Sequence, residues 1–222
     1  MRLAYRLIRA FLQLFFALFT RFVVVGREAL PCSGPLIVAT NHIGILDPPA
    51  LMVAAPWPVT AFAAKKWSRH FWGHFLRSVG AIFVNRGEVD REALRSALRV
   101  LERGGILGMA PEGTRSKTRR LQPARPGVAY LAHLSGAPIV PVAITGTERV
   151  LPSLLRLQRA EVRVTFGEPF TLPAVDRRAR AGNLLEQADL VMQRIAALLP
   201  PEYRGAYAKP GLVRERSPAP RG

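Results

Sequence analysis

Short apolar runs alternate along the chain with longer segments of helical periodicity, and this alternation limits the possible folds more than any other feature of the sequence. The run Leu36–Thr40 (LIVAT) follows the turn signal Pro31–Pro35, which predicts a short buried strand. Helices are predicted where apolar residues recur at helical spacing and a glycine or proline ends the pattern. The expected strands are 36–40, 59–63, 81–84, 106–110, 139–144 and 162–166, and the expected helices are 88–103, 128–135 and 184–199.

Strands that alternate with helices are typical of an α/β domain with a buried, largely parallel sheet. A chain of 222 residues is long enough to bury a sizeable core, and its hydrophobic content of 49% excludes a fully disordered chain. We therefore expect a single α/β domain over residues 26–200, with a largely parallel mixed sheet flanked by helices. Residues 201–222 are rich in Pro, Arg and Gly and are expected to form a mobile basic tail.

The first 25 residues (MRLAYRLIRAFLQLFFALFTRFVVV) combine positive charge with a wide apolar surface. On a helix, positions 2, 6, 9 and 13 (three arginines and a glutamine) fall within roughly a 60° arc, and the remaining surface is apolar. Such a helix lies in the lipid headgroup region, where its arginines contact anionic lipid. The uncharged run Ala10–Thr20 is short for a spanning helix, which needs about 20 apolar residues. We expect residues 1–25 to be an amphipathic membrane-docking helical segment, with a spanning helix, a core helix or a signal peptide as alternatives.

The net charge of +17, from 32 Lys and Arg against 15 Asp and Glu, points to a polyanionic partner. A nucleic-acid binder is the rival class, but the sequence lacks a helix-turn-helix, zinc or aromatic-strand signature. Nucleic-acid binding would also not explain the apolar N-terminal segment. We therefore expect anionic membrane lipids as partners and no nucleic acid, with the protein peripheral or monotopic on the cytoplasmic face of the cell membrane. The single Cys32 excludes an intramolecular disulfide and a thiolate zinc site. No metal is expected, because His70 and His74 have helical ligand spacing but no nearby carboxylate.

A histidine and an aspartate follow the predicted strand 36–40, in the order Asn41, His42 and Asp47. In a turn that leads into a helix, this spacing can bring the Asp47 carboxylate back to the His42 imidazole. Asp47 would then set the tautomer, and His42 would take a proton from a hydroxyl group. No Ser or Cys in the segment offers a nucleophile, so the hydroxyl would belong to the substrate. The alternative for Asp47 is a helix N-cap with Pro48 at the first helical position, and the two roles do not exclude each other.

Two further predicted strands end in cations. The strand 81–84 leads into Arg86, and the strand 106–110 leads into Glu112, Gly113, Thr114 and Arg115. Gly113 allows a tight turn close to a ligand, Thr114 offers a hydroxyl, and the planar Arg115 guanidinium suits phosphate. The alternative is a solvated basic loop, because more Lys and Arg residues follow. Sites in α/β folds lie at the carboxyl edge of the sheet, where these segments would meet.

Together with a fourth segment at Pro138–Ala143, these three segments resemble the ordered motifs of the glycerolipid acyltransferases. They most closely resemble the motifs of 1-acylglycerol-3-phosphate acyltransferases. The matching segments, over roughly residues 21–200, are Asn41-His42 with Asp47, Gly80–Arg86, Pro111–Ser116 and Pro138–Ala143. The resemblance implies the fold of glycerol-3-phosphate acyltransferases with an N-terminal membrane-docking element. It also implies transfer of a fatty acyl group from acyl-CoA or acyl-carrier protein to the 2-hydroxyl of a 1-acylglycerol-3-phosphate acceptor. No cofactor is implied beyond the thioester co-substrate.

The resemblance assigns a role to each matching residue. It implies His42 as general base with Asp47 as its partner, and Arg86, Thr114 and Arg115 as ligands of the acceptor phosphate. Asn41, Glu112 and Gly113 would belong to the same substrate-binding pocket. The chain departs from the family where Ala124–Gly127 replaces an aromatic residue and lysines, and where Ser116–Arg120 is unusually basic. Another acceptor, such as lyso-ornithine lipid, glycerol 3-phosphate or another lysophospholipid, and an inactive scaffold of the same fold remain as alternatives.

Overall fold

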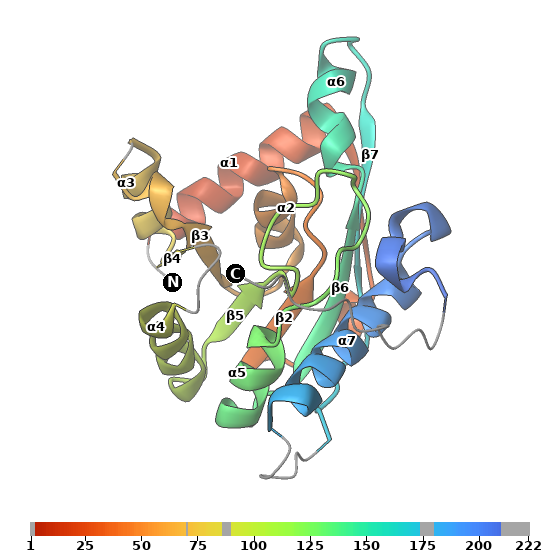
Figure 1. The fold of residues 1–222 in the computed structure, drawn as a ribbon. Helices are drawn as coiled ribbons and strands as arrows, with labels where there is room; N and C mark the ends of the chain where they lie inside the picture. Colours follow the sequence, from red (N-terminus) through yellow and green to blue (C-terminus); the bar gives the residue numbers. More distant parts are fainter. Residues whose placement is uncertain (1–2, 70, 86–89, 174–179, 210–222) are drawn as a thin grey trace.

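The computed structural model describes residues 3–69, 71–85, 90–173 and 180–209. These residues form a seven-stranded sheet in the order β1-β7-β6-β2-β5-β3-β4 (Figure 1). The strands are β1 Thr20–Val25, β2 Leu36–Thr40, β3 Thr60–Ala64, β4 Ile82–Val84, β5 Ile106–Met109, β6 Ile139–Thr145 and β7 Ala160–Phe166. β2 to β6 run parallel to one another, β7 is antiparallel to β6, and β1 is parallel to β7. The expected largely parallel mixed sheet is therefore confirmed.

Helices cover both faces of this sheet (Figure 1). They are α1 Leu3–Phe19, α2 Asp47–Ala54, α3 Phe71–Ser78, α4 Arg91–Glu102, α5 Gly127–Ser135, α6 Val150–Leu154 and α7 Arg180–Leu198. Short 3₁₀ helices occur at Arg27–Ala29, Lys65–Trp67, Thr147–Arg149, Pro201–Tyr203 and Gly205–Tyr207. Six strands and three helices lie within a few residues of their predicted bounds. The sequence analysis did not predict α6.

Alternate residues of the central strands supply the two halves of the core. In β2, Ile37 and Ala39 pack toward α4, α5 and α7, whereas Leu36 and Val38 pack toward α1 and α2. Every residue of β2 is buried. This agrees with its nearly continuous apolar sequence, which is typical of strands in a parallel sheet covered on both faces.

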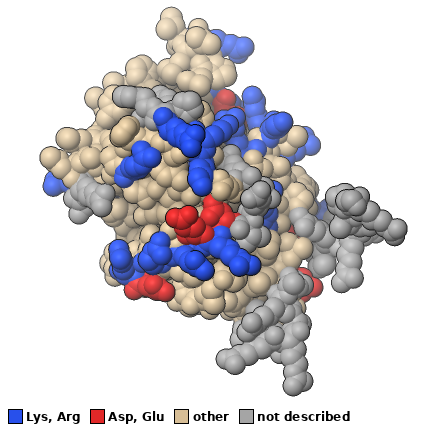
Figure 2. Space-filling view, turned by 60° about the vertical axis from the view of Figure 1, so that its left-hand side comes forward, with Lys and Arg blue, Asp and Glu red and all other residues tan. Residues whose placement is uncertain are grey.

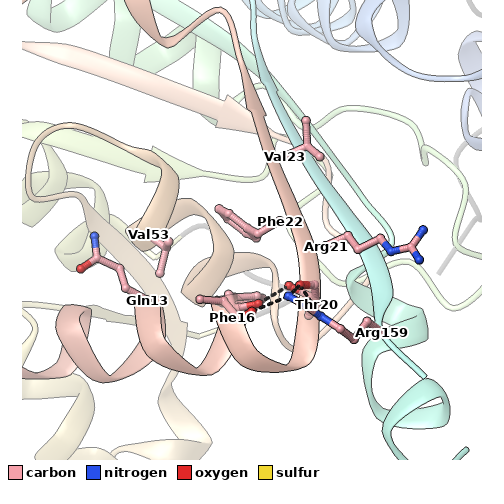
Figure 3. Close-up of a pocket in the computed structure, with 9 residues that line it drawn as sticks. Gln13, Phe16, Thr20, Arg21, Phe22, Val23, Val53 and Arg159 are labelled. Carbon is pink, nitrogen blue, oxygen red and sulfur yellow. Dashed lines mark hydrogen bonds between the residues drawn. The ribbon is translucent and has the colours of Figure 1, made fainter. Parts of the chain in front are cut away.

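Residues 20–25 form strand β1, which corrects the expectation of a helical segment through residue 25. The run TRFVVV ends in three valines, whose branched side chains favour a strand, and it pairs in parallel register with β7. The helix stops where this pairing begins. Arg159, which immediately precedes β7, donates from Nη2 and Nε to the carbonyl of Thr20 and from Nη2 to that of Ala17. Figure 3 shows these bonds beside a groove of about 560 Å³ between α1 and β1.

The polar arc of α1 does not face outward as a whole, which corrects the expectation that all its arginines reach lipid. Arg9 turns toward the body of the protein and donates to the carbonyls of Ala55 (2.7 Å) and Val53 (3.4 Å) at the end of α2. A cation at this position satisfies carbonyls that lack partners within the helix. The outward side of α1 is instead an apolar stripe of exposed residues, defined here as Leu3, Leu7, Phe11, Leu14 and Leu18.

The packed domain extends beyond the expected boundary at residue 200. Tyr203 and Tyr207 are buried in the core that contains α5 and α7. The Tyr207 hydroxyl accepts from Ala124 N (2.9 Å) and donates to Asp189, and Leu121 N donates to Tyr203 O (2.9 Å). Residues 201–208 are therefore part of the fold rather than of a mobile tail. Residues 210–222 lie outside the described residues.

Candidate active site

Three neighbouring parallel strands bring the loops that carry candidate site residues to one edge of the sheet. β2 lies between β6 and β5, and all three strands run in the same direction. The residues that follow Thr40, Met109 and Thr145 therefore meet at the carboxyl edge, where sites of α/β folds form. The loop that carries His42 lies in the middle of this group, supported from both sides.

His42 and Asp47 form the expected side-chain pair. His42 Nδ1 lies 2.8 Å from Asp47 Oδ2, and Asp47 is only 2% exposed. The same oxygen accepts hydrogen bonds from the backbone N–H groups of Ile43 (2.7 Å) and Gly44 (2.8 Å). Because the carboxylate can only accept, the proton of a neutral His42 ring belongs on Nδ1, and Nε2 keeps its lone pair. The half-buried imidazole can therefore accept a proton through Nε2.

Asp47 does not act as an N-cap of α2. Its carboxylate binds groups that precede the helix, and no side chain caps the first turn. Leu46 occupies the cap position, and prolines 48 and 49 reduce the number of N–H groups that need a partner. Of the two roles considered for Asp47, the geometry therefore favours partnership with His42.

Thr147 completes the environment of Asp47, and the sequence analysis missed it. Its side-chain hydroxyl donates to Asp47 Oδ1, and the residue is buried. The preceding Gly146 has a φ of +84°, and a Cβ there would lie 1.9 Å from the carbonyl oxygen of Glu161. Only glycine fits this turn, which aims Thr147 at Asp47. The signal available in the sequence was a Gly-Thr pair that follows the predicted strand 139–144 after one intervening residue.

Glu112 supports the main chain of His42 and is buried itself. Its Oε1 accepts from His42 N (3.1 Å), and its Oε2 accepts from Gln122 N (3.0 Å). Burial raises the pKa of the Glu112 carboxyl to about 7, although these backbone hydrogen bonds oppose the shift. The residue therefore joins two loops of the site and shapes it without presenting its carboxylate to solvent.

The turn that contains Gly113, Thr114 and Arg115 lies beside His42. Glu112 accepts from the N–H of His42, and Ser116 N donates to the carbonyl of His42 (2.8 Å). Because the three residues of the turn lie between Glu112 and Ser116 in the chain, these two bonds hold the turn beside His42. Gly113 has a φ of +72°, and a Cβ there would lie 2.7 Å from Cδ of Arg125. Thr114 is half-buried and Arg115 is exposed. This turn provides a hydroxyl and a guanidinium next to the His42–Asp47 pair.

Asn41 was also expected at the site, but its side chain is engaged within the sheet. Asn41 is fully buried and forms two hydrogen bonds with the backbone of Ile144. Asn41 Nδ2 donates to Ile144 O (2.8 Å), and Ile144 N donates to Asn41 Oδ1 (2.7 Å). Its amide joins β2 to β6, so its polar atoms are already occupied, which corrects the expectation that it binds substrate. Arg86 lies outside the described residues.

The loop after the site is strongly basic. Its exposed cations are Arg115, Lys117, Arg119, Arg120 and Arg125. When the side that carries α3 and α4 is turned forward, basic side chains lie on both sides of a small acidic group (Figure 2). The described residues contain no group of three or more His, Cys, Asp or Glu that could hold a metal ion, and His70 lies outside them.

Comparison with known proteins identifies the family of this chain. The chain matches the model of the family described as Acyltransferase over residues 21–145, which is more than half of its length. The chain belongs to the acyltransferase family. The match contains the His42–Asp47 pair and the turn from Glu112 to Ser116. The resemblance inferred from the four ordered motifs is therefore confirmed, and the protein is an acyltransferase.

Curated relatives of this acyltransferase have consistent names. It is 28% identical over 174 residues to the 1-acyl-sn-glycerol-3-phosphate acyltransferase of Bacillus subtilis, an alignment that covers 74% of this chain and 84% of the relative. It is 30% identical over 165 residues to a probable 1-acyl-sn-glycerol-3-phosphate acyltransferase of Mycoplasma pneumoniae, covering 71% of this chain and 60% of the relative.

A solved structure has the same fold as this acyltransferase. The crystal structure of the 1-acyl-sn-glycerophosphate acyltransferase PlsC from Thermotoga maritima superposes with a TM-score of 0.66 and 24% identity. The superposition covers 87% of this chain and 79% of that one. At this identity the comparison establishes the α/β fold alone. Within the described part of this chain, no helix is long and apolar enough to cross a bilayer.

Proposed function

We propose that this acyltransferase moves a fatty acyl group from an acyl thioester to the 2-hydroxyl of 1-acylglycerol-3-phosphate, giving phosphatidate. The names of the relatives from Bacillus subtilis and Mycoplasma pneumoniae support this acceptor. The observation that carries the mechanism is the contact of 2.8 Å between His42 Nδ1 and Asp47 Oδ2, which leaves Nε2 as a proton acceptor. The donor is acyl-CoA or acyl-carrier protein, and the reaction needs no metal or organic cofactor.

The proposed reaction is a direct attack without an acyl-enzyme intermediate. His42 Nε2 takes the proton of the acceptor hydroxyl while its oxygen attacks the thioester carbonyl carbon. Asp47 stabilises the imidazolium that forms and keeps the ring in place through Nδ1. When the tetrahedral intermediate collapses, the carbon–sulfur bond breaks and the thiolate takes the proton from Nε2. The products are the ester and the free thiol, and His42 returns to its starting state.

The acceptor phosphate is assigned to cations beside this pair. Arg115 and Thr114 follow Glu112, and the two hydrogen bonds to the main chain of His42 keep their turn next to the imidazole. A guanidinium can bind two phosphate oxygens at once, and the threonine hydroxyl can donate to a third. Arg86 is proposed to contribute a second cation. Binding of the phosphate at this turn would present the neighbouring 2-hydroxyl to His42.

Membrane association accompanies this function in the proposal. The acceptor carries a long acyl chain and stays in the bilayer, and the donor is anionic. The apolar stripe of α1 is exposed, while the exposed Arg6 lies on one flank of the helix. An amphipathic helix with this pattern lies flat in the headgroup region. We place the protein as a peripheral or monotopic enzyme on the cytoplasmic face of the cell membrane, with anionic lipids as partners.

A transfer assay with a labelled acyl thioester tests the function directly. Lysophosphatidate and lyso-ornithine lipid are offered side by side to the wild type, to His42→Ala and to Arg115→Ala. We expect labelled phosphatidate from the wild type and a loss on the order of a thousandfold in His42→Ala, since the general base is removed. Arg115→Ala is expected to raise KM for lysophosphatidate.

Each contrary outcome identifies the part of the proposal that fails. Product from lyso-ornithine lipid alone would keep the chemistry and replace the acceptor. Full activity of Arg115→Ala with lysophosphatidate, together with an inactive His42→Ala, would remove Arg115 from the phosphate site. Transfer by His42→Ala at the wild-type rate would reject the general base.

A further inference from the structure

The corner between α6 and β7 carries leucines that are exposed to solvent. Leu155 is 89% exposed and Leu157 is 97% exposed, and Leu151 is exposed by more than half. We define the leucine corner as residues 151–157. In Figure 1 it is the outermost part of the molecule at the top, and in Figure 2 it projects from the body as a mostly uncharged knob with a basic side chain at its rim.

Backbone hydrogen bonds hold the leucine corner in a defined shape. Arg156 N donates to Ser153 O (3.0 Å), Leu157 N to Leu154 O (3.0 Å) and Gln158 N to Ser153 O (2.9 Å). Leu157 has a φ of +55°, a left-handed conformation that is rare for a residue with a branched apolar side chain. The corner therefore keeps a strained backbone and presents apolar side chains to water, and both features occur at functional sites.

Two connections tie the leucine corner to the active site and to α1. The corner begins four residues after Thr147, whose hydroxyl binds Asp47. It ends two residues before Arg159, whose guanidinium binds the carbonyls of Ala17 and Thr20 at the end of α1 (Figure 3). Along the chain, the corner thus joins the residue that supports Asp47 to the residue that binds the end of α1.

Cations outnumber carboxylates around the leucine corner, although Glu148 and Glu161 also lie near it in the chain and pair with Arg149 and Arg163. Arg149, Arg156 and Arg159 are exposed near it, and the chain as a whole has a net charge of +17. Apolar side chains with a basic rim match an anionic bilayer surface, in which leucines enter the acyl region and arginines stay with the headgroups. A neutral or basic protein partner would not complement this excess of positive charge.

We propose that the leucine corner is a second membrane-inserting element, which docks on anionic lipid together with the α1 stripe and brings the His42 edge to the bilayer surface. This inference rests on the membrane association proposed above. Two contacts separated along the molecule fix its orientation, whereas a single flat helix leaves rotation about its axis free. The consequence is that the acceptor reaches His42 without leaving the lipid surface.

Sedimentation with vesicles of equal parts phosphatidylcholine and phosphatidylglycerol tests the proposal on the full chain. The double variant Leu155→Ser/Leu157→Ser is compared with the wild type and with Leu134→Ser. Leu134 is the matched control, because it is also a highly exposed leucine but lies on α5, on the opposite face of the sheet. We expect the double variant to bind vesicles at least about tenfold more weakly, since two leucines lose their transfer into lipid, and the control to bind like the wild type.

A second readout covers the case in which the double variant folds poorly. In Leu157→Trp, the added tryptophan should be quenched by brominated lipid beyond the quenching of the three native tryptophans. Absence of extra quenching, or vesicle binding by the double variant equal to that of the wild type, would overturn the proposal. Equal weakening in Leu134→Ser would also reject it, because the effect would then come from any exposed leucine.

The outcomes also separate this proposal from the ones it rests on. If Leu7→Ser/Phe11→Ser in α1 abolishes binding and the leucine-corner variant does not change it, docking by α1 stands alone. If the wild type fails to bind vesicles, both docking surfaces are rejected, while the acyl-transfer assay in detergent still decides the enzymatic function. If the wild type is a dimer without lipid and the double variant is a monomer with unchanged vesicle binding, the corner is an interface between copies.

Discussion

Asp47 holds His42 through one carboxylate oxygen, and its other oxygen depends on Thr147. Oδ2 accepts from His42 Nδ1 and from two backbone amides, whereas Oδ1 accepts from the Thr147 hydroxyl. Without that hydroxyl the buried carboxylate is held through Oδ2 alone and Oδ1 loses its donor, which costs energy and loosens the orientation of the group. Thr147 is therefore a positioning residue that acts on His42 through Asp47.

We expect Thr147→Val to lower kcat on the order of tenfold and to leave KM for both substrates within about twofold, since the hydroxyl does not touch substrate. Thr147→Ser keeps the hydroxyl and should restore most of kcat. Steady-state kinetics on both variants, at a temperature where circular dichroism shows each folded, provides the measurement. A rise in KM with unchanged kcat would contradict the positioning role.

Glu112 makes the stability of the fold depend on pH in an unusual direction for a carboxylic acid. Burial raises the pKa of its carboxyl from 4.5 to about 7, so the folded protein binds this proton more tightly than the unfolded chain does. The stabilisation is complete below the unfolded value and is lost as the pH rises through about 7. The size of the contribution is about 3 kcal/mol at most, from the linkage between pKa and stability.

The prediction for Glu112→Gln is that the free energy of unfolding loses this decline between pH 4.5 and about 7. Urea denaturation of both proteins across this range measures the slope. Glu161→Gln is the control, because Glu161 is a half-exposed surface carboxylate paired with Arg163. The same slope in wild type and Glu112→Gln would show that Glu112 stays ionised in the folded protein.

At the scale of elements, the C-terminal segment supports the basic loop of the site. Tyr207 inserts between α7 and the loop that follows Ser116, and its hydroxyl connects Ala124 N to Asp189. Tyr203 similarly joins the segment to the residue next to Thr147, because its hydroxyl donates to Glu148 Oε1 (2.8 Å). Burial and the neighbouring Glu148 raise the pKa of Tyr203 to about 12, so it stays a hydrogen-bond donor at physiological pH.

Removal of the Tyr207 hydroxyl tests this support. We expect Tyr207→Phe to lower the free energy of unfolding by about 1–3 kcal/mol, because it leaves buried hydrogen-bonding groups without their partner. Tyr130→Phe, on the exposed side of α5, should change it by less than about 0.5 kcal/mol. Chemical denaturation measures both variants, and equal stabilities would mean that the segment only lies on the surface of the domain.

At the scale of the whole molecule, charge and apolar surface would have separate effects on the proposed membrane binding. The net charge of +17 attracts the protein to anionic lipid over roughly a Debye length, about 10 Å at moderate salt. The α1 stripe contributes apolar burial, which salt does not screen. The two contributions can therefore be distinguished by ionic strength.

We expect vesicle binding to weaken by on the order of tenfold or more when salt rises from about 0.05 M to about 0.5 M, and to keep a residual part that depends on the apolar stripe. Leu7→Ser/Phe11→Ser should abolish the residual binding at high salt and keep much of the salt-sensitive binding. Sedimentation at several salt concentrations measures both. Binding that does not respond to salt would show that the basic surface has another role.

Sequence patterns alone determined the class of the fold, the order of most elements and the residues of the His42–Asp47 pair. These features depend on local periods: buried strands such as β2 are continuous apolar runs, and helix α4 repeats leucine at helical spacing. The contact between His42 and Asp47 also spans only five residues, so local turn geometry was enough to predict it.

Contacts between residues far apart in the chain could be identified only from the three-dimensional structure. Thr147 binds Asp47 across 100 positions, and Asn41 exchanges hydrogen bonds with Ile144 across 103, which makes it a structural residue. β1 required β7 as a partner, and Arg9 faces inward because α2 ends beside it. The physical reason is that apolar periodicity is a property of neighbours in sequence, whereas the partner of a long-range hydrogen bond depends on which strands lie side by side in the sheet. The sheet places β6 beside β2, and this arrangement brings Thr147 to the His42–Asp47 pair as a second support.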